Sequence, residues 1–303
     1  MADPQELIIV GVDAAWRRSR ALDWAVREAL VRERPLRAIH VVDEEIRNDD
    51  MWDAVDIDGF KVVPVKVDEE ADRLVQEVSD ELAKIDTKLD LGADLRVGKP
   101  VEVLIELSET ALMLVLGRHG YGVFRRLLIG STSDAVANRA KGPVVVIPDG
   151  WQADEHGDEP VLVGVDWTEP SEDAVLDFAI DFAAVHGVPL KLIVVWDAPW
   201  AFAFHNPASE AQLEGWQGMA EQRARELTEQ WGSKRPDVEV SYELRRGHPV
   251  ERLVEAAEES QAQLLAIGGR RRNRAAELIG LGSVADGVLH HATRPLAVVH
   301  ERR

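Results

Sequence analysis

The feature that most constrains this chain is that it repeats itself. Residues 9–13 read IVGVD, and residues 162–166 read LVGVD. Residues 98–102 read GKPVE, and residues 247–251 read GHPVE. The copies lie about half of the 303-residue chain apart, whereas the repeats of solenoid proteins are only ~20–50 residues long. The sequence therefore predicts two copies of one domain.

The segment between the copies has the composition of a linker. Residues 148–160 are rich in proline, glycine and acidic side chains, which is typical of a boundary between domains. We place that boundary near residues 150–158, so the expected domains are residues 1–149 and 158–303.

Each copy alternates short apolar runs with helical patterns. In the first copy, strands are expected at residues 7–12, 36–42, 95–97, 112–116 and 144–147, and helices at 22–30, 74–89, 101–107 and 131–140. Strands that are apolar throughout indicate a sheet covered on both faces, and intervening helices indicate right-handed parallel crossovers. We expect an α/β fold of two tandem doubly wound, Rossmann-like domains, each a five-stranded parallel sheet flanked by helices.

The composition excludes several classes of protein. There is no cysteine, so disulfide scaffolds, thiolate zinc sites and cysteine nucleophiles are excluded. Acidic side chains number 55 against 35 basic ones, a net charge of −20, which disfavours nucleic acid and anionic membranes as partners. The segment of residues 1–6 is short and polar and no apolar run approaches ~20 residues, so we expect no leader peptide and no membrane span. We expect a soluble, cytoplasmic protein.

A ligand of such a sheet binds beyond the carboxyl ends of the strands, near the point where the strand order reverses. Asp13 follows the first strand and Asp166 is its equivalent. Either carboxylate can accept hydrogen bonds from a ribose or a base, or it can be an ordinary turn or helix-cap residue. The second strand of each copy ends in residues 40–43 or 194–197. Backbone groups there can pair with an adenine edge, or the strand can simply continue.

A glycine-rich loop joins the strand at 112–116 to the next helix. Residues 117–120 read GRHG, and Gly130-Ser131 follow nine residues later. Free amides at the start of a helix attract anions, and glycine lets a phosphate approach the backbone. The alternative is a glycine turn with a serine N-cap. No metal site is predicted, because the histidines are scattered and the adjacent His290 and His291 point ~100° apart on a helix.

The glycine pattern carries a family resemblance. Gly-x₂-Gly-x₉-Gly-Ser resembles the signature of ATP-binding universal stress proteins, and the resemblance spans both copies. It implies that Asp13 and the Val41 backbone hold adenosine. It also implies that the remaining loop residues contact the ribose and phosphates, namely Gly117, Gly120, Gly130, Ser131, Thr132 and Ser133. ATP, accompanied by magnesium, is the implied ligand.

The second copy departs from this pattern. Its equivalent residues are Asp166, Val195, Gly269, Gly282, Ser283 and Val284. Counting back from Gly282 aligns Gly269 with Gly117 and Arg272 with Gly120, whereas an alignment with Gly268 needs a one-residue insertion. Ala285 replaces Ser133. Nearby arginines can attract a phosphate or fill its space, and we expect a weaker or altered second site.

The resemblance implies a nucleotide-dependent regulator or sensor in a stress response. No activated nucleophile, general base or arginine finger is identifiable, so we expect at most weak ATP hydrolysis. A slow adenine-nucleotide-processing enzyme and a dimerisation module with a vestigial pocket are the alternatives. The family resemblance implies that the last strands of the two copies, 144–147 and 296–299, meet. We also expect a homodimer, with a regulatory protein partner that the sequence does not identify.

Overall fold

The computed structural model describes residues 6–43, 55–57, 60–62, 67–118, 130–152, 157–168, 173–197, 209–269 and 282–300. The elements of the first half are β1 (Ile8–Gly11), α1 (Trp16–Ser19), α2 (Ala21–Arg32), β2 (Leu36–Val42), β3 (Val55–Ile57), β4 (Phe60–Val62), α4 (Val67–Leu82), β5 (Leu91–Val97), α5 (Pro100–Ser108), β6 (Met113–Gly117), α6 (Ser131–Arg139) and β7 (Val144–Ile147). Those of the second half are β8 (Val161–Val165), α7 (Asp173–His186), β9 (Leu190–Trp196), α9 (Glu210–Lys234), β10 (Val240–Arg246), α10 (Pro249–Glu259), β11 (Leu264–Gly268), α11 (Ser283–His291) and β12 (Leu296–Val299).

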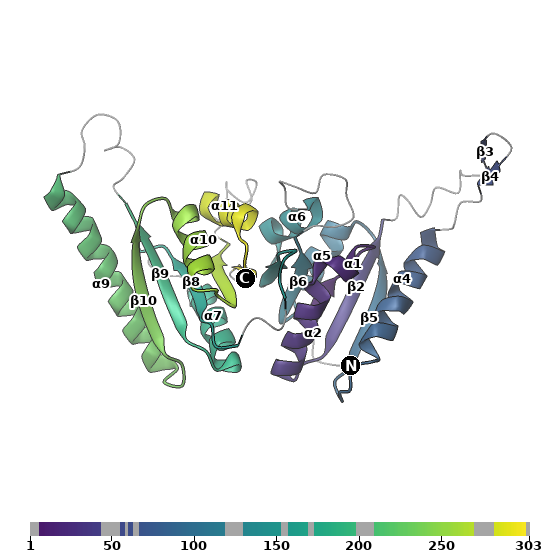
Figure 1. The fold of residues 1–303 in the computed structure, drawn as a ribbon, viewed down its shortest axis with the longest axis horizontal. Helices are drawn as coiled ribbons and strands as arrows, with labels where there is room; N and C mark the ends of the chain where they lie inside the picture. The colour runs from purple at the N-terminus through teal and green to yellow at the C-terminus, as the bar shows by residue number, and fades with distance from the viewer. Residues whose placement is uncertain are drawn as a thin grey trace.

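One ten-stranded sheet runs through both halves (Figure 1). Its strand order is β10-β9-β8-β11-β12-β7-β6-β1-β2-β5, and β3 pairs with β4 apart from it. The five strands within each half pair in parallel, while β7 and β12 pair antiparallel, with Val146 opposite Leu296 and Val144 opposite Val298. The predicted fold is therefore confirmed, and so is the predicted meeting of the last strands. The homodimer stays a prediction, because this contact joins two parts of one chain.

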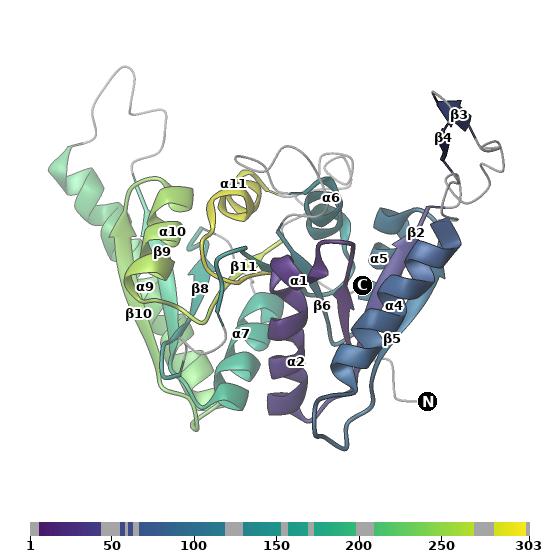
Figure 2. The same ribbon diagram turned by 45° about the vertical axis from the view of Figure 1, so that its right-hand side comes forward.

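Helices cover both faces of the sheet (Figures 1 and 2). Strand residues alternate between the faces. Ile8 and Val10 belong to the core that α2, α4, α7 and α9 cover, while Ile9 belongs to the core that α5, α6, α10 and α11 cover. Each of the two hydrophobic cores contains residues of both halves. Burial of both faces is the physical reason why the central strands, such as β6 and β7, hold only apolar residues and glycine, whereas the edge strands β5 and β10 carry charged ones.

The repeated Gly-x-Pro motif has a backbone explanation. Gly98 and Gly247 have φ angles of +144° and +133°, a region that side chains other than glycine rarely adopt. Pro100 and Pro249 follow at the first helical position of α5 and α10, where the missing N–H costs nothing. Each motif forms the turn that joins a strand to the helix after it, β5 to α5 and β10 to α10.

Several bounds differ from the sequence-based expectation. The strand expected at residues 95–97 begins at Leu91. The helix expected to extend to residue 89 ends at Leu82, although Ile85 still packs against the core. Trp151, in the expected linker, is only 5% exposed and belongs to the core. The boundaries 1–149 and 158–303 remain predictions.

Candidate functional site

Each half of the sheet contains one point at which the strand order reverses. In the first half this point lies between β1 and β6, because β2 and β5 follow on one side and β7 on the other. Asp13 follows β1 and Gly117 ends β6, so both lie at this point at the carboxyl edge of the strands. Asp166 and Gly268 lie there in the second half. Ligands of open parallel sheets bind at such positions.

The two aspartates hold the turns that follow their strands. Asp13 Oδ1 accepts a hydrogen bond of 2.8 Å from the Ala15 N–H. Asp166 Oδ1 accepts bonds from the N–H and the hydroxyl of Thr168, at 3.0 and 2.5 Å. One oxygen of each carboxylate therefore serves the turn, as the structural alternative predicts. An ionised carboxylate has about four acceptor sites on its two oxygens, so each aspartate can hold its turn and still accept a bond from a ligand.

Val41 lies where β2 extends beyond β1. The last pair of the β1–β2 ladder is Gly11 with Ile39, whereas Val41 is paired with β5 through Arg96. The β1-facing edge of β2 beyond Ile39 is thus outside that ladder. Val195 of β9 likewise follows the last pair of β8 with β9. These are the strand ends at which the family resemblance places adenine.

Two hydrogen bonds join the ends of the glycine-rich loop in the first half. The Ser133 hydroxyl donates to the Gly117 carbonyl at 2.6 Å, and the Gly130 N–H donates to the Arg118 carbonyl at 2.7 Å. Ser133 is buried, and its hydroxyl already donates its one proton to the Gly117 carbonyl. In this conformation the hydroxyl is not a donor to a phosphate. Gly120 lies outside the described residues. These two hydrogen bonds hold the ends of the loop together, and we call the joined residues 117–118, 130 and 133 the mouth of the loop.

The sheet register decides between the two alignments of the second loop. Gly117 pairs with Ile147 of β7, and Gly268 pairs with Val299 of β12. The next N–H groups, those of Arg118 and Gly269, donate to the Ile147 and Val299 carbonyls at 2.9 and 2.8 Å. Gly268, not the predicted Gly269, is therefore the equivalent of Gly117, and the second loop is one residue longer. Its arginines at residues 270–274 lie outside the described residues.

The helices that follow these loops begin without a side-chain cap. Their N-cap residues are Gly130 for α6 and Gly282 for α11, so the alternative of a serine N-cap is wrong. The contrast is α9, whose N-cap Ser209 forms a complete capping box. First-turn amides have no partner within their helix and favour an anion. Ser131 and Ser283 are exposed and Thr132 and Val284 half-buried in these first turns, so α6 presents one hydroxyl more than α11.

Two side chains that the sequence did not single out cross between the halves beside these loops. Arg118 donates from Nη1 to the Ala292 carbonyl at 2.6 Å and from Nη2 to the His290 carbonyl. Burial lowers the pKa of the Arg118 guanidinium, and Asp149 opposes that shift. His300 is 5% exposed, and its ring nitrogens lie 3.1 Å from the Gly269 carbonyl and 2.8 Å from the Ala137 carbonyl. Arg118 lies at the end of α11, where its helix dipole favours a cation.

A hollow of about 630 Å³ opens between α10 and α11 in the second half. Of the predicted ligand residues it contains Ser283; its other polar lining includes His248, Glu251 and His291. The described residues among those predicted thus lie at the same edge of the sheet in each half, and Ser283 also lines a hollow in the second half.

Comparison with known proteins identifies the family. The family model described as "Universal stress protein family" matches residues 6–148 and again residues 159–300. The chain belongs to the universal stress protein family. A universal stress protein of Mycolicibacterium smegmatis is 31% identical over 300 residues, covering 97% of each chain. One of Mycobacterium tuberculosis is 30% identical over 310 residues, covering 98% of each.

Solved structures agree on the fold of this universal stress protein. The crystal structure of a universal stress protein from Archaeoglobus fulgidus matches with a TM-score of 0.67 at 20% identity and covers 99% of both chains. The described residues include no helix that is both long and apolar enough to cross a membrane.

Proposed function

We propose that this universal stress protein binds an adenine nucleotide, ATP with magnesium, at the carboxyl edge of its first half, and that nucleotide occupancy regulates partners in a stress response. The observation that carries the proposal is the placement of the loop. Its ends are Gly117 and Gly130, and Gly117 lies beside Asp13 at the point where the strand order reverses.

The chemistry of this edge suits a nucleotide. The uncapped first turn of α6 and the hydroxyls of Ser131 and Thr132 face the phosphates in this proposal, while Asp13 and the edge of β2 at Val41 take the adenosine. Magnesium would neutralise phosphate charge, and no described carboxylate is assigned to it. The second half binds more weakly in this proposal, because its loop is longer and Ala285 cannot form the bond that Ser133 makes.

The first test is to identify the nucleotide released when the purified protein is denatured, and to measure ATP turnover. The proposal expects bound ATP and a turnover far below the ~1–10³ s⁻¹ of ordinary enzymes. Bound ADP or an adenylylated product would support the adenine-nucleotide-processing enzyme instead. A turnover within that range that a Ser131→Ala variant loses would contradict the non-catalytic proposal. Failure to bind added ATP by calorimetry would support the dimerisation module.

A further inference from the structure

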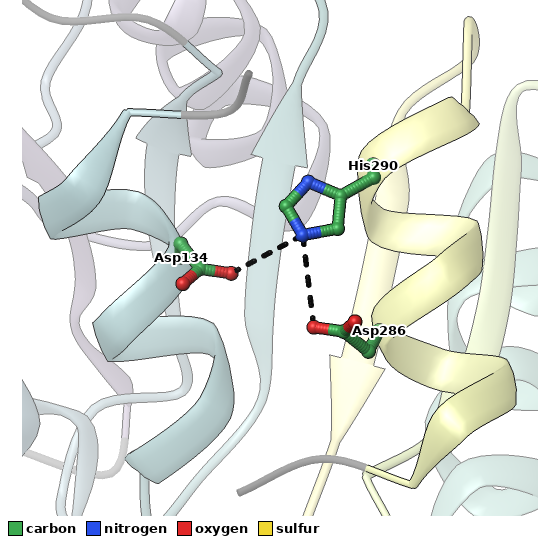
Figure 3. Close-up of side chains that lie close together, drawn as sticks. All are labelled: Asp134, Asp286 and His290. Carbon is green, nitrogen blue, oxygen red and sulfur yellow. Dashed lines mark ion pairs between the residues drawn. The ribbon is translucent and has the colours of Figure 1, made fainter.

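Helices α6 and α11 face each other across the contact between the two halves, and three side chains meet between them (Figure 3). Asp134 lies in the first turn of α6, and Asp286 occupies the equivalent position in α11. His290 follows Asp286 by one helical turn and points between the two carboxylates. The cluster therefore draws its side chains from both copies of the repeat.

The distances within this cluster are too long for hydrogen bonds. His290 Nε2 lies 3.7 Å from Asp286 Oδ1 and 3.9 Å from Asp134 Oδ1, whereas such bonds are ~2.7–3.2 Å long. One ligand atom from each residue lies within 4.8 Å of the other two. An ion equidistant from such atoms would be about 2.5 Å from each, a few tenths of an ångström beyond Zn–N and Zn–O bonds of ~2.0–2.2 Å.

A neighbouring group orients one of the three side chains, that of Asp134. Asn138, the equivalent of His290 in α6, donates from Nδ2 to Asp134 Oδ1 at 3.2 Å and to the Asp134 carbonyl at 2.8 Å. His290 Nδ1 is buried and has no partner within the described part of the chain, so Nε2 is the ring nitrogen that faces polar groups there. Hydrogen-bonded ligand carboxylates are a regular feature of metal sites.

The charge of the cluster calls for a cation. The two ionised carboxylates carry a charge of −2, which one divalent ion balances. The side chains remain reachable from solvent, with exposed fractions of 36% for Asp134, 49% for Asp286 and 29% for His290.

We propose that Asp134, Asp286 and His290 bind one divalent transition-metal cation between the two halves, with Zn²⁺ as the best-matched ion. Imidazole nitrogen together with carboxylate oxygen suits Zn²⁺ better than Mg²⁺, which prefers oxygen ligands and retains its water. Three protein ligands leave a fourth position of a tetrahedral site for water. The bound ion links α6 to α11, and its binding does not require a nucleotide.

Calorimetric titration of the chelator-treated, nucleotide-free full chain with Zn²⁺ tests the site. We expect one Zn²⁺ per chain, with affinity at least about tenfold lower in Asp134→Asn and His290→Asn. The His290→Asn variant places in α11 the residue that α6 already carries at position 138, so its fold should be retained. The matched control is His291→Asn, which alters the neighbouring histidine that lines the hollow instead.

A second readout follows from linkage, because a ligand that binds only the folded chain raises its melting temperature. Zn²⁺ should raise the melting temperature of the wild type and of His291→Asn, and should fail to raise that of His290→Asn. Equimolar Mg²⁺ should not displace the bound Zn²⁺. The proposal is wrong if the wild type binds no Zn²⁺, if His290→Asn binds it as tightly as the wild type, or if His291→Asn abolishes binding.

Discussion

The two halves share one sheet plan and differ where the sheet meets a ligand. Strand pairing is equivalent on both sides of the β7–β12 contact, down to the register of Gly117 with Ile147 and Gly268 with Val299. The following loop is one residue longer in the second half, and Ala285 replaces the serine that fixes the mouth of the first loop. Duplication has preserved what packing requires and has let the two edges diverge.

The contact between the halves is unequal as well. Arg118 crosses from the first half, whereas its equivalent Gly269 leaves room for His300, which crosses from the second half. His290 stands where the first half has Asn138, which is how a mixed cluster arises from two equivalent aspartates. A pseudo-symmetric pair can thus carry features that neither copy has alone.

The largest expected effect comes from the equivalent helices α2 and α7, which lie side by side (Figures 1 and 2). Glu28 of α2 has a side chain only 2% exposed and binds Arg32 and, at 2.8 Å, His186 of α7. Glu28→Ala should lower the free energy of unfolding by about 3–5 kcal/mol, because it removes the buried partner of Arg32, whose side chain is only 6% exposed. Its equivalent Asp181 is 53% exposed although it also pairs with Arg32, so Asp181→Ala should cost about 1 kcal/mol or less. Urea denaturation of both variants measures the difference, and equal costs would contradict the inequality of the two helices.

Next in size is a test of the register with two adjacent glycines. A Cβ on Gly269 would lie 2.4 Å from the His300 ring, which two carbonyl contacts hold in place, whereas a Cβ on Gly268 meets nothing within 4 Å. Gly269→Ala should therefore destabilise the protein by about 1–3 kcal/mol through overpacking. Gly268→Ala should change the free energy of unfolding by less than about 0.5 kcal/mol. Thermal denaturation would refute the assignment if the two variants ranked in the opposite order.

The smallest of these effects concerns the mouth of the loop. Ser133→Ala removes the bond to the Gly117 carbonyl and should cost about 1 kcal/mol of stability. It should also weaken ATP binding several-fold, because the loop is then less preorganised. The reciprocal variant Ala285→Ser introduces the same hydroxyl into the second half. An ATP affinity unchanged in Ser133→Ala would show that the fixed mouth is irrelevant to binding.

The sequence predicts the fold well because packing leaves direct traces in it. Runs such as residues 112–116 and 144–147 are apolar throughout since both faces are buried, and the strands expected there match β6 and β7 to within one residue. The hydrogen bonds that Arg118 and His300 form between the two halves cannot be predicted from the sequence. Their partners are backbone carbonyls, which any residue type supplies, and they lie 163 to 174 residues away in the chain. The alignment of the second loop also needed the register, since counting residues from Gly282 cannot locate an insertion.

The most direct test of the account is calorimetric titration with ATP of the wild type, Asp13→Asn and Asp166→Asn. Asparagine keeps the oxygen that accepts the turn hydrogen bond, so each variant changes the ligand-facing charge while preserving the turn. A hydrogen bond to a charged group contributes ~1.5–3 kcal/mol, or about one to two decades in affinity. We predict that Asp13→Asn weakens the tighter ATP site by that amount and that Asp166→Asn leaves it unchanged. Tight binding that survives in Asp13→Asn and disappears in Asp166→Asn would contradict the account.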